Sequence, residues 1–275
     1  MDDDATVESR KVWDSVAEAW DKERAFLNER ERPVTERLLE ALGVQARDRI
    51  LELCAGPGEV GLTLAARHPE ARVLITDFAP RMVEAASAAA AGRGLGNVEL
   101  RLMDAQDIDL PDASVDGVLC RYGLMLVPHI PEAFAGIRRV LRPGRILAYT
   151  TWAPPEMNPW MTILGATLMQ RGHFQPPEGA QGFPLGDEAS NLDVARAAGF
   201  EDVSWEPVDV TLRFPTFQRY WELTTGVAGP LVGIVKGLPD DEREAVRAQI
   251  EEYAAPFRTD GGLSFPSRRN LIRAR

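Results

Sequence analysis

Three acidic side chains accompany a glycine-rich loop whose spacing is typical of a nucleotide-binding site. Residues 56–61 read GPGEVG, a G-x-G-x-x-G string between an expected strand and an expected helix. Glu52 precedes this loop, Asp77 ends the next expected strand, and Asp104 ends the one after it. A carboxylate at Glu52 repels a pyrophosphate but attracts an ammonium group, and one at Asp77 accepts hydrogen bonds from ribose hydroxyls. The arrangement favours a positively charged nucleoside over a dinucleotide.

Short apolar runs alternate with helical patterns over the first 152 residues. Helices are expected to begin at Pro80 and Pro131, since proline suits the first turn of a helix, and the second helix is expected to stop at Pro143-Gly144. Strands that alternate with helices of about ten residues indicate a parallel sheet covered on both faces. The five expected strands cover residues 49–53, 72–76, 98–103, 115–120 and 145–152.

The two ends of the chain follow other patterns. Residues 6–30 are charged, with apolar side chains at helical spacing, and predict one or two amphipathic helices. Beyond residue 152 the chain is richer in proline and glycine, and its last strand is expected to return to the same sheet. The expected elements there are a short helix near 160–170, a helix at 192–198, a strand at 203–214, helices over 216–258 and a closing strand at 263–273.

Length, charge and cysteine content narrow the classes of protein. The 275 residues predict one large domain or two small ones. The formal net charge of -11 disfavours nucleic acid and membrane surfaces as partners, and the basic run at 268–275 is short. Two cysteines are too few for a disulfide framework. The acidic N-terminus has the wrong charge for a targeting peptide, so we expect a cytoplasmic protein.

Four motifs, in this order, resemble class I S-adenosylmethionine (SAM) dependent methyltransferases, specifically the menaquinone/ubiquinone-biosynthesis-like branch (methyltransferase type 11). The resemblance is good over about residues 10–152 and loose over 153–275. It departs from the family at two positions: Cys54 stands for the first loop glycine, and Gly144-Arg145 for a double glycine. The motifs are ILELCAGPG (50–58), ITDFAPRMVEAA (75–86), LMDAQDIDLPDASVDGVLC (102–120) and RRVLRPGRIL (138–147).

The resemblance implies an α/β fold. It predicts a Rossmann-like, mostly parallel sheet of seven strands in the order 3-2-1-4-5-7-6, with helices on both faces and a helical lid. We expect an N-terminal helical cap at 1–45, a SAM-binding core at 46–152, and the remaining core strands at 153–275. Lid inserts are expected at 153–188 and 216–258.

The resemblance also implies the cofactor contacts. Glu52 would hold the methionine ammonium, Asp77 would bind the ribose, and Asp104 would accept the adenine amino group. Gly56 and Gly58 would let the backbone approach the ligand. A loop cap is the alternative role for Asp77. The remaining implied contacts are Trp20, Cys54, Phe78, Met82, Ala105, Gln106, Arg121 and Tyr122.

Two of these contacts concern the transferred methyl group. Arg121 and Tyr122, just past the fourth strand, would flank the methionine moiety and the methyl. Trp20 would close over the cofactor, where an aromatic ring near the sulfonium gains cation–π attraction. Its alternative is a core position on an amphipathic helix.

Methyl transfer from a sulfonium is an in-line displacement, so the protein mainly aligns the reactants and excludes water. A general base is needed only when the acceptor must lose a proton of high pKa. The candidates are His129, His173 and Tyr122, and His129 has the alternative role of capping the helix at Pro131. The sequence shows no spacing typical of a metal site.

The two cysteines form a further hypothesis. Cys54 and Cys120 would lie at the ends of neighbouring strands, about 5 Å apart. They would face each other as reduced thiols beside the cofactor, and modification of the thiols would block SAM binding. The alternative is two small buried hydrophobic residues.

The acceptor is predicted from the segments that cover the sheet. These are rich in aromatic residues and methionine, which favours an apolar acceptor, although the same residues could form the core of the lid. Resemblance to quinone-pathway enzymes suggests a phenol, quinol or natural-product intermediate. The expected acceptor-binding residues are Trp152, Trp160, Phe174 and Trp221.

The sequence therefore predicts an enzyme that moves the methyl of SAM to a small, largely apolar molecule, leaves S-adenosylhomocysteine, and works as a monomer or homodimer. One alternative is a non-catalytic SAM-binding effector or interaction protein, in which side chains would fill the acceptor site. Another is an NAD-dependent oxidoreductase, which Glu52 and Asp104 disfavour. A protein or RNA methyltransferase is disfavoured by the acidic surface.

Overall fold

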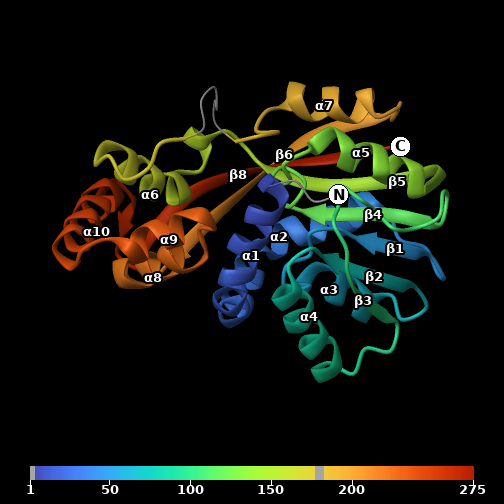
Figure 1. Cartoon of the computed structure of the whole chain (residues 1–275), viewed down its shortest axis with the longest axis horizontal. Helices are drawn as coiled ribbons and strands as arrows, with labels where there is room; N and C mark the ends of the chain where they lie inside the picture. The colour runs from blue at the N-terminus through green and yellow to red at the C-terminus, as the bar shows by residue number, and fades with distance from the viewer. Residues whose placement is uncertain (1–3, 177–182) are drawn as a thin grey trace.

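The computed structural model describes residues 4–176 and 183–275, and these form a sheet covered by helices (Figure 1). Within the described residues the sheet runs β3-β2-β1-β4-β5-β8-β6, and the two-residue β7 pairs with β8. Without β7 this is the predicted order 3-2-1-4-5-7-6, which is confirmed. The strands are β1 (Arg49–Glu52), β2 (Arg72–Asp77), β3 (Val98–Leu102), β4 (Val115–Arg121), β5 (Leu141–Trp152), β6 (Val203–Phe214), β7 (Arg258–Thr259) and β8 (Gly262–Ala274).

Helices cover both faces of the parallel strands. Helices α2, α3 and α4 contact one face, and α5 and α7 contact the other. Buried apolar side chains from both faces of the strands form the two main core clusters, which explains why the strands read as continuous apolar runs. The helices are α1 (Asp4–Lys22), α2 (Arg24–Leu42), α3 (Glu59–Arg67), α4 (Pro80–Gly92), α5 (Ile130–Val140), α6 (Pro159–Gln170), α7 (Glu188–Ala197), α8 (Phe217–Val227), α9 (Pro230–Gly237) and α10 (Asp240–Ala254).

The end of α5 differs from the sequence prediction. Its buried side chains Phe134, Ile137 and Val140 lie on one face, as the helical spacing predicts. The helix ends at Val140, before Pro143-Gly144, because Leu141 already pairs with Val115 of β4. Tertiary strand pairing therefore ends the helix before the proline does.

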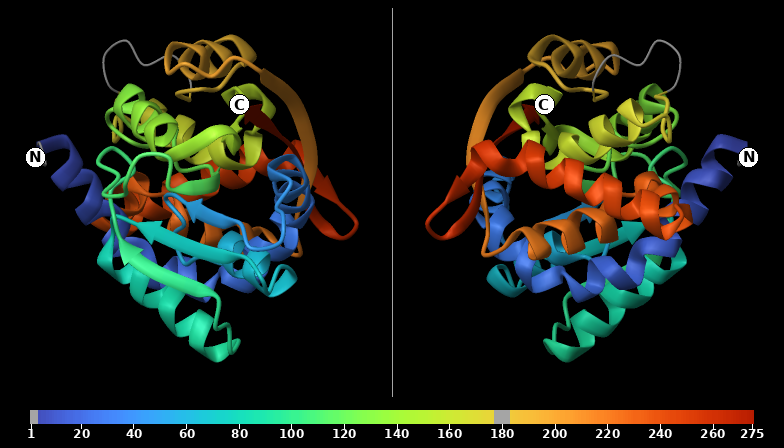
Figure 2. Two further views of the ribbon diagram at one scale, coloured as in Figure 1. Left: turned by 90° about the vertical axis from the view of Figure 1, so that its right-hand side faces the viewer. Right: turned by 90° about the vertical axis from the view of Figure 1, so that its left-hand side faces the viewer.

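A helical unit lies beyond the carboxyl end of β5. Helices α6, α8, α9 and α10 gather there, and the long antiparallel strands β6 and β8 extend from the sheet to reach them (Figures 1 and 2). Their core is a third apolar cluster that includes Phe214, Tyr220 and Phe265. The predicted lid segments 153–188 and 216–258 are largely helical here, but residues 177–182 of the first lie outside the described part of the chain.

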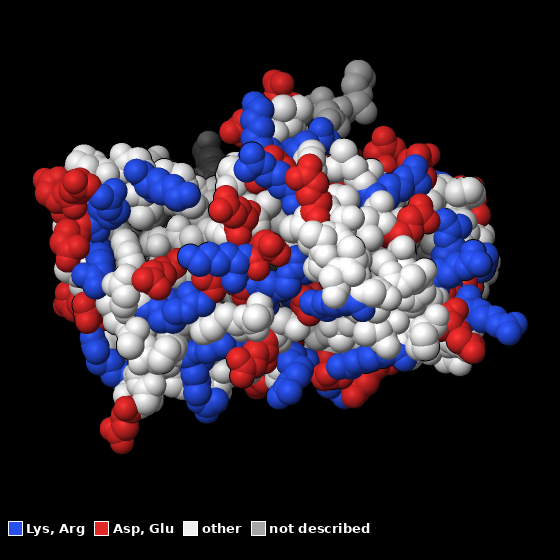
Figure 3. Space-filling model, turned by 90° about the horizontal axis from the view of Figure 1, so that it is seen from below, with Lys and Arg blue, Asp and Glu red and all other residues white. Residues whose placement is uncertain are grey.

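The N-terminal helices connect the two parts. Helix α1 packs against α4 of the sheet and α8 of the helical unit, and α2 lies along β4, β5 and β6. Acidic and basic side chains are interspersed over the face of the molecule that Figure 3 shows. Among the described residues, none of the helices has the length and apolar character needed to cross a membrane.

Candidate functional site

The loop after β1 has the backbone of a glycine loop, even at its cysteine. Cys54 has φ 50°, close to the 55° of Gly56, and Gly58 at the start of α3 has φ 81°. This left-handed region costs a residue with a side chain about 1–2 kcal/mol. Cys54 thus adopts a conformation that glycine favours, although it carries a side chain.

Asp77 ties this loop to the start of α4. Its carboxylate accepts hydrogen bonds from the backbone N–H of Gly56 at 2.8 Å and of Ala79 at 2.9 Å. Burial raises the pKa of this carboxyl to about 6, against the lowering effect of the backbone N–H groups. Asp77 therefore caps the loop, the alternative role that the sequence left open. Its carboxylate also lies at the carboxyl end of β2, where the ribose contact is predicted.

Glu52, the last residue of β1, is only 1% exposed. Its carboxylate accepts a hydrogen bond from the N–H of Gly61 at 2.8 Å, and a β-carbon at Gly61 would overlap it. Burial raises the pKa of Glu52 to about 8. The site therefore holds a protonated acid near neutral pH, which a nearby cation would ionise.

The side chain of Gln106 connects the loop after β3 to the start of α5. The carboxylate of Asp104 accepts hydrogen bonds from the Gln106 backbone N–H at 2.9 Å and its side-chain amide at 3.1 Å. The amide oxygen of Gln106 accepts from the backbone N–H of His129 at 2.7 Å. Asp104, Gln106 and the backbone of His129 are thus brought to one edge, while the His129 side chain is exposed.

Trp20 packs over the residues expected to contact adenine. It joins an apolar cluster that includes Met82, Ala79 and Phe78. Its indole N–H is buried and has no hydrogen-bond partner among the described residues, a state that costs about 1–3 kcal/mol. A ligand with an acceptor atom would satisfy this donor. The residues present therefore fit a nucleoside at this edge.

The two cysteines are neighbours, as predicted. The thiols of Cys54 and Cys120 are free and hydrogen-bonded to each other, and this bond together with burial raises the pKa of Cys54. Gly123 packs on both, since a β-carbon there would lie 2.9 Å from each sulfur. Their expected effect on SAM binding stays a prediction.

Three of the predicted side chains form a cluster of rings, the aromatic stack, near the ends of β4 and β5. The rings of Tyr122 and Trp152 are stacked with centroids 4.4 Å apart, and the ring of Trp160 on α6 lies 5.5 Å from Trp152, tilted by 56°. Two other expected acceptor residues, Phe174 and Trp221, are partly buried and pack against the apolar cluster of the helical unit, to which Trp160 also belongs. The structure thus unites Tyr122, Trp152 and Trp160.

A buried ion pair that the sequence did not predict lies beneath this stack. Arg269 of β8 is 0% exposed and contacts Glu31 of α2 at 2.6 Å. The Tyr122 hydroxyl donates to Glu31 and accepts from Nε of Arg269 at 2.8 Å. Both charged residues belong to charged segments that are typical of a protein surface, so no local signal identifies them.

His173 lies in the helical unit. Its Nε2 is 2.7 Å from the carboxylate of Glu242 on α10. Hydrogen bonds from Arg171 and then from His173 lower the pKa of Glu242 to about 2. Among the three candidate bases, Tyr122 is the one in the aromatic stack, and burial raises its pKa.

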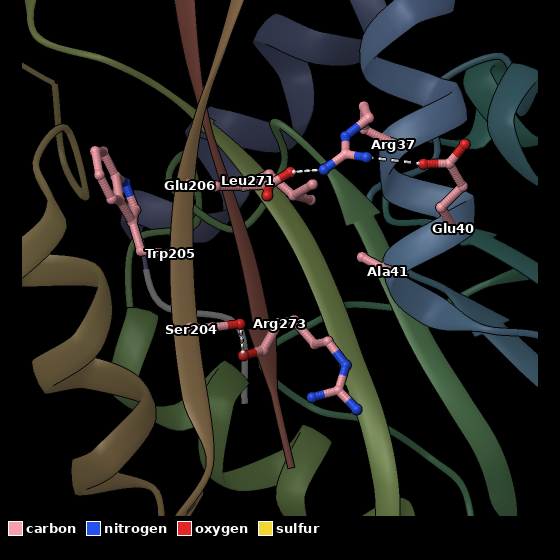
Figure 4. Close-up of a pocket in the computed structure, with 8 residues that line it drawn as sticks. All are labelled: Arg37, Glu40, Ala41, Ser204, Trp205, Glu206, Leu271 and Arg273. Atoms are coloured by element: carbon pink, nitrogen blue, oxygen red, sulfur yellow. Dashed lines mark hydrogen bonds and ion pairs between the residues drawn. The ribbon is translucent and has the colours of Figure 1, made fainter.

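Figure 4 shows a groove of about 300 Å³ at a different place, between α2 and the strands β6 and β8. Arg37 is ion-paired with Glu40 of the same helix at 3.0 Å and, across the groove, with Glu206 of β6 at 2.6 Å. None of the predicted site residues lines this groove.

Comparisons with known proteins identify the family of this chain. A family model described as a methyltransferase domain matches residues 50–144. The chain is 32% identical over 216 residues to nocamycin O-methyltransferase of Saccharothrix syringae, covering 70% of this chain and 77% of that protein. It is 32% identical over 206 residues to demethylmenaquinone methyltransferase of Thermus thermophilus, covering 69% and 83%.

A solved structure shares the fold over nearly the whole chain. The cyclase SpnF superposes with a TM-score of 0.60 at 20% identity and covers 95% of each chain. The chain belongs to the class I SAM-dependent methyltransferases, and SAM is its cofactor.

Proposed function

We propose that the protein transfers the methyl group of SAM to a small, largely apolar acceptor of the phenol, quinol or natural-product type. The observation that carries this proposal is the stack of Tyr122, Trp152 and Trp160 at the ends of β4 and β5. Flat rings at the carboxyl edge of the sheet suit a flat apolar ligand. The names of the two relatives, a nocamycin O-methyltransferase and a demethylmenaquinone methyltransferase, support the same class.

The cofactor contacts in this proposal are those of the sequence prediction. Glu52 and Asp77 would hold the ammonium and the ribose. Phe78 and Met82 would contact the adenine, and Trp20 would close over the cofactor. Bound SAM supplies a methyl group that its sulfonium already activates for displacement. The chain's own part is to align an acceptor atom with that methyl and to exclude water from it.

Proton removal concerns only acceptors that react through a hydroxyl group. His129, His173 and Tyr122 remain the proposed candidates, and Tyr122 is the one within the aromatic stack. The acceptor is proposed to be a free small molecule rather than a nucleic acid, since the net charge is -11. We also propose a cytoplasmic monomer or homodimer.

One observation favours the alternative of a SAM-binding effector. Trp160 is only 7% exposed and donates its indole N–H to Ser267 at 2.9 Å, so this side chain is packed as in a closed core. An effector would keep the aromatic stack closed, whereas an enzyme must admit an acceptor to it.

The two functions separate in a transfer assay with methyl-labelled SAM. We expect label to move to 1,4-naphthoquinol or catechol and not to a DNA oligonucleotide or a lysine-containing peptide. Tight SAM binding without transfer to either aromatic acceptor would favour the effector. Transfer to the peptide or the oligonucleotide would contradict the proposed acceptor class.

A further inference from the structure

We propose that Glu31 and Arg269 are positioning residues that hold the Tyr122 ring against Trp152 and thereby set the affinity for the acceptor. The inference rests on the proposed function, because it takes the aromatic stack as the acceptor site. It adds two charged residues that the family motifs quoted above do not contain.

Arg269 contacts two rings of the stack directly and is linked to the third through Ser267. Its Nε donates to the Tyr122 hydroxyl at 2.8 Å, and its guanidinium carbon lies 3.8 Å from the centre of a Trp152 ring. Its Nη1 donates to the hydroxyl of Ser267, which in turn accepts the indole N–H of Trp160 at 2.9 Å. One buried guanidinium thus connects all three aromatic side chains.

Glu31 completes this arrangement as an anion. Burial alone would raise its pKa, but the charge and hydrogen bonds of Arg269, with smaller contributions from Arg121 and Tyr122, lower the pKa below its ordinary value. A carboxylate of low pKa is a poor proton acceptor at neutral pH. Its role is therefore to anchor Arg269 and the Tyr122 hydroxyl rather than to remove a proton.

The backbone of Tyr122 shows why an anchor is needed. Tyr122 has φ 68°, the left-handed region that residues with side chains rarely adopt. Such a conformation persists only where surrounding contacts determine it. The Tyr122 hydroxyl is hydrogen-bonded to Glu31 of α2 and to Arg269 of β8. These two residues are 238 positions apart in the sequence.

The test uses Tyr122→Phe and Glu31→Gln, with Tyr149→Phe as the matched control. Tyr122→Phe keeps the ring and the ion pair but removes the anchored hydroxyl. Tyr149 of β5 is fully buried, and its hydroxyl donates to the carbonyl of Asn191 at 3.3 Å, outside the stack. The measurements are kcat and KM for 1,4-naphthoquinol and the Kd for SAM.

We expect both test variants to raise the KM for 1,4-naphthoquinol about tenfold, with the SAM Kd changed less than twofold. Tyr149→Phe should change neither constant by more than twofold. Equal losses of SAM and acceptor affinity, no change in KM, or the same KM increase in Tyr149→Phe would overturn the proposal. If Glu31→Gln fails to fold, Tyr122→Phe, which keeps the ion pair, decides between these outcomes.

A spectroscopic readout separates this proposal from the proposed function. The near-ultraviolet circular dichroism of the folded protein reports its fixed aromatic side chains, including the stacked Tyr122 and Trp152. Glu31→Gln keeps every aromatic ring and should still reduce that signal with an unchanged far-ultraviolet spectrum, even if the wild type methylates no aromatic acceptor. An unchanged near-ultraviolet spectrum in Glu31→Gln would show that the ring needs no anchor and would contradict the inference.

Discussion

Gly123 and Cys54 lie so close together that a β-carbon on Gly123 would overlap the β-carbon of Cys54. The same atom would lie 2.9 Å from the sulfurs of Cys54 and Cys120. The segment after β4 therefore packs on the glycine loop with no room for another side chain. The glycine loop can hold the side chain of Cys54 because Gly123, which packs against it, has no side chain of its own.

This contact predicts the effect of Gly123→Ala. The added methyl group must displace the loop, and overpacking of this kind costs about 1–3 kcal/mol of unfolding free energy. We expect that loss in chemical denaturation, together with weaker SAM binding by calorimetry, because the displaced loop carries Gly56 and Gly58.

Cys54→Gly supplies the matching control. It removes the overlapping β-carbon at φ 50°, where glycine is unstrained. In that background Gly123→Ala should cost less by about 1 kcal/mol. Strictly additive losses would show that the two residues do not compete for the same space.

Glu52 predicts a proton linked to SAM binding. Burial raises its pKa from 4.5 to about 8. Between these two pH values Glu52 is protonated in the native state and ionised in the unfolded state. The stability of the ligand-free protein should therefore fall as the pH rises from about 4.5 to about 8. A bound cation would ionise Glu52, so SAM binding near pH 7 should release protons.

Calorimetry in buffers of different ionisation enthalpy measures this release. Glu52→Gln should abolish most of it. Asp48→Asn is the control, because Asp48 is also a buried acid but is paired with Arg145 at 2.9 Å, before the start of β1. Proton release that survives Glu52→Gln would mean that another group titrates.

Much of the fold and part of the site follow from the sequence, for physical reasons. The alternation of strands and helices predicts a parallel sheet covered on both faces, and the carboxyl ends of its strands bring Glu52, Asp77 and Asp104 to one edge. Glu31 and Arg269 could not be predicted, because their pairing depends on the tertiary approach of α2 and β8. A charged residue in a charged segment is usually exposed, and only the structure shows that these two are buried.

The helical unit gives a pH prediction that is independent of SAM. Hydrogen bonds from Arg171 and His173 lower the pKa of Glu242 to about 2, below the ordinary 4.5. A depressed pKa stabilises the folded state above pH 4.5, and this contribution is lost as the pH falls toward 2. Thermal unfolding of Glu242→Gln should therefore show a lower Tm than wild type at pH 7, with the difference shrinking below pH 4.5.

The exposed Glu244 serves as the control for that series. It pairs with Arg247 at 3.2 Å on the same helix, and exposed pairs of this kind contribute little. Glu244→Gln should leave the Tm nearly unchanged at every pH. A pH-independent difference for Glu242→Gln would exclude its carboxylate as the origin of the effect.

Trp160 predicts a division between acceptor and cofactor binding. Trp160→Ala removes the third ring of the stack and should raise the KM for 1,4-naphthoquinol about tenfold or more, with the SAM Kd nearly unchanged. Trp205→Ala is the matched control, since Trp205 is a partly buried tryptophan of β6 that donates to Asn270. Equal loss of both affinities in Trp160→Ala would refute this division.

The most direct test of the cofactor site is SAM affinity for wild type and Asp77→Ala, measured by calorimetry with NAD as a second ligand. Asp116→Ala is the control. Asp116 lies at the start of β4, at the edge of the sheet opposite to Asp77, and is ion-paired with Arg142 of β5 at 2.6 Å. We expect tight SAM binding to wild type and to Asp116→Ala, about 100-fold weaker binding to Asp77→Ala, and none of NAD. NAD binding in place of SAM, or full SAM affinity in Asp77→Ala, would contradict the site described here.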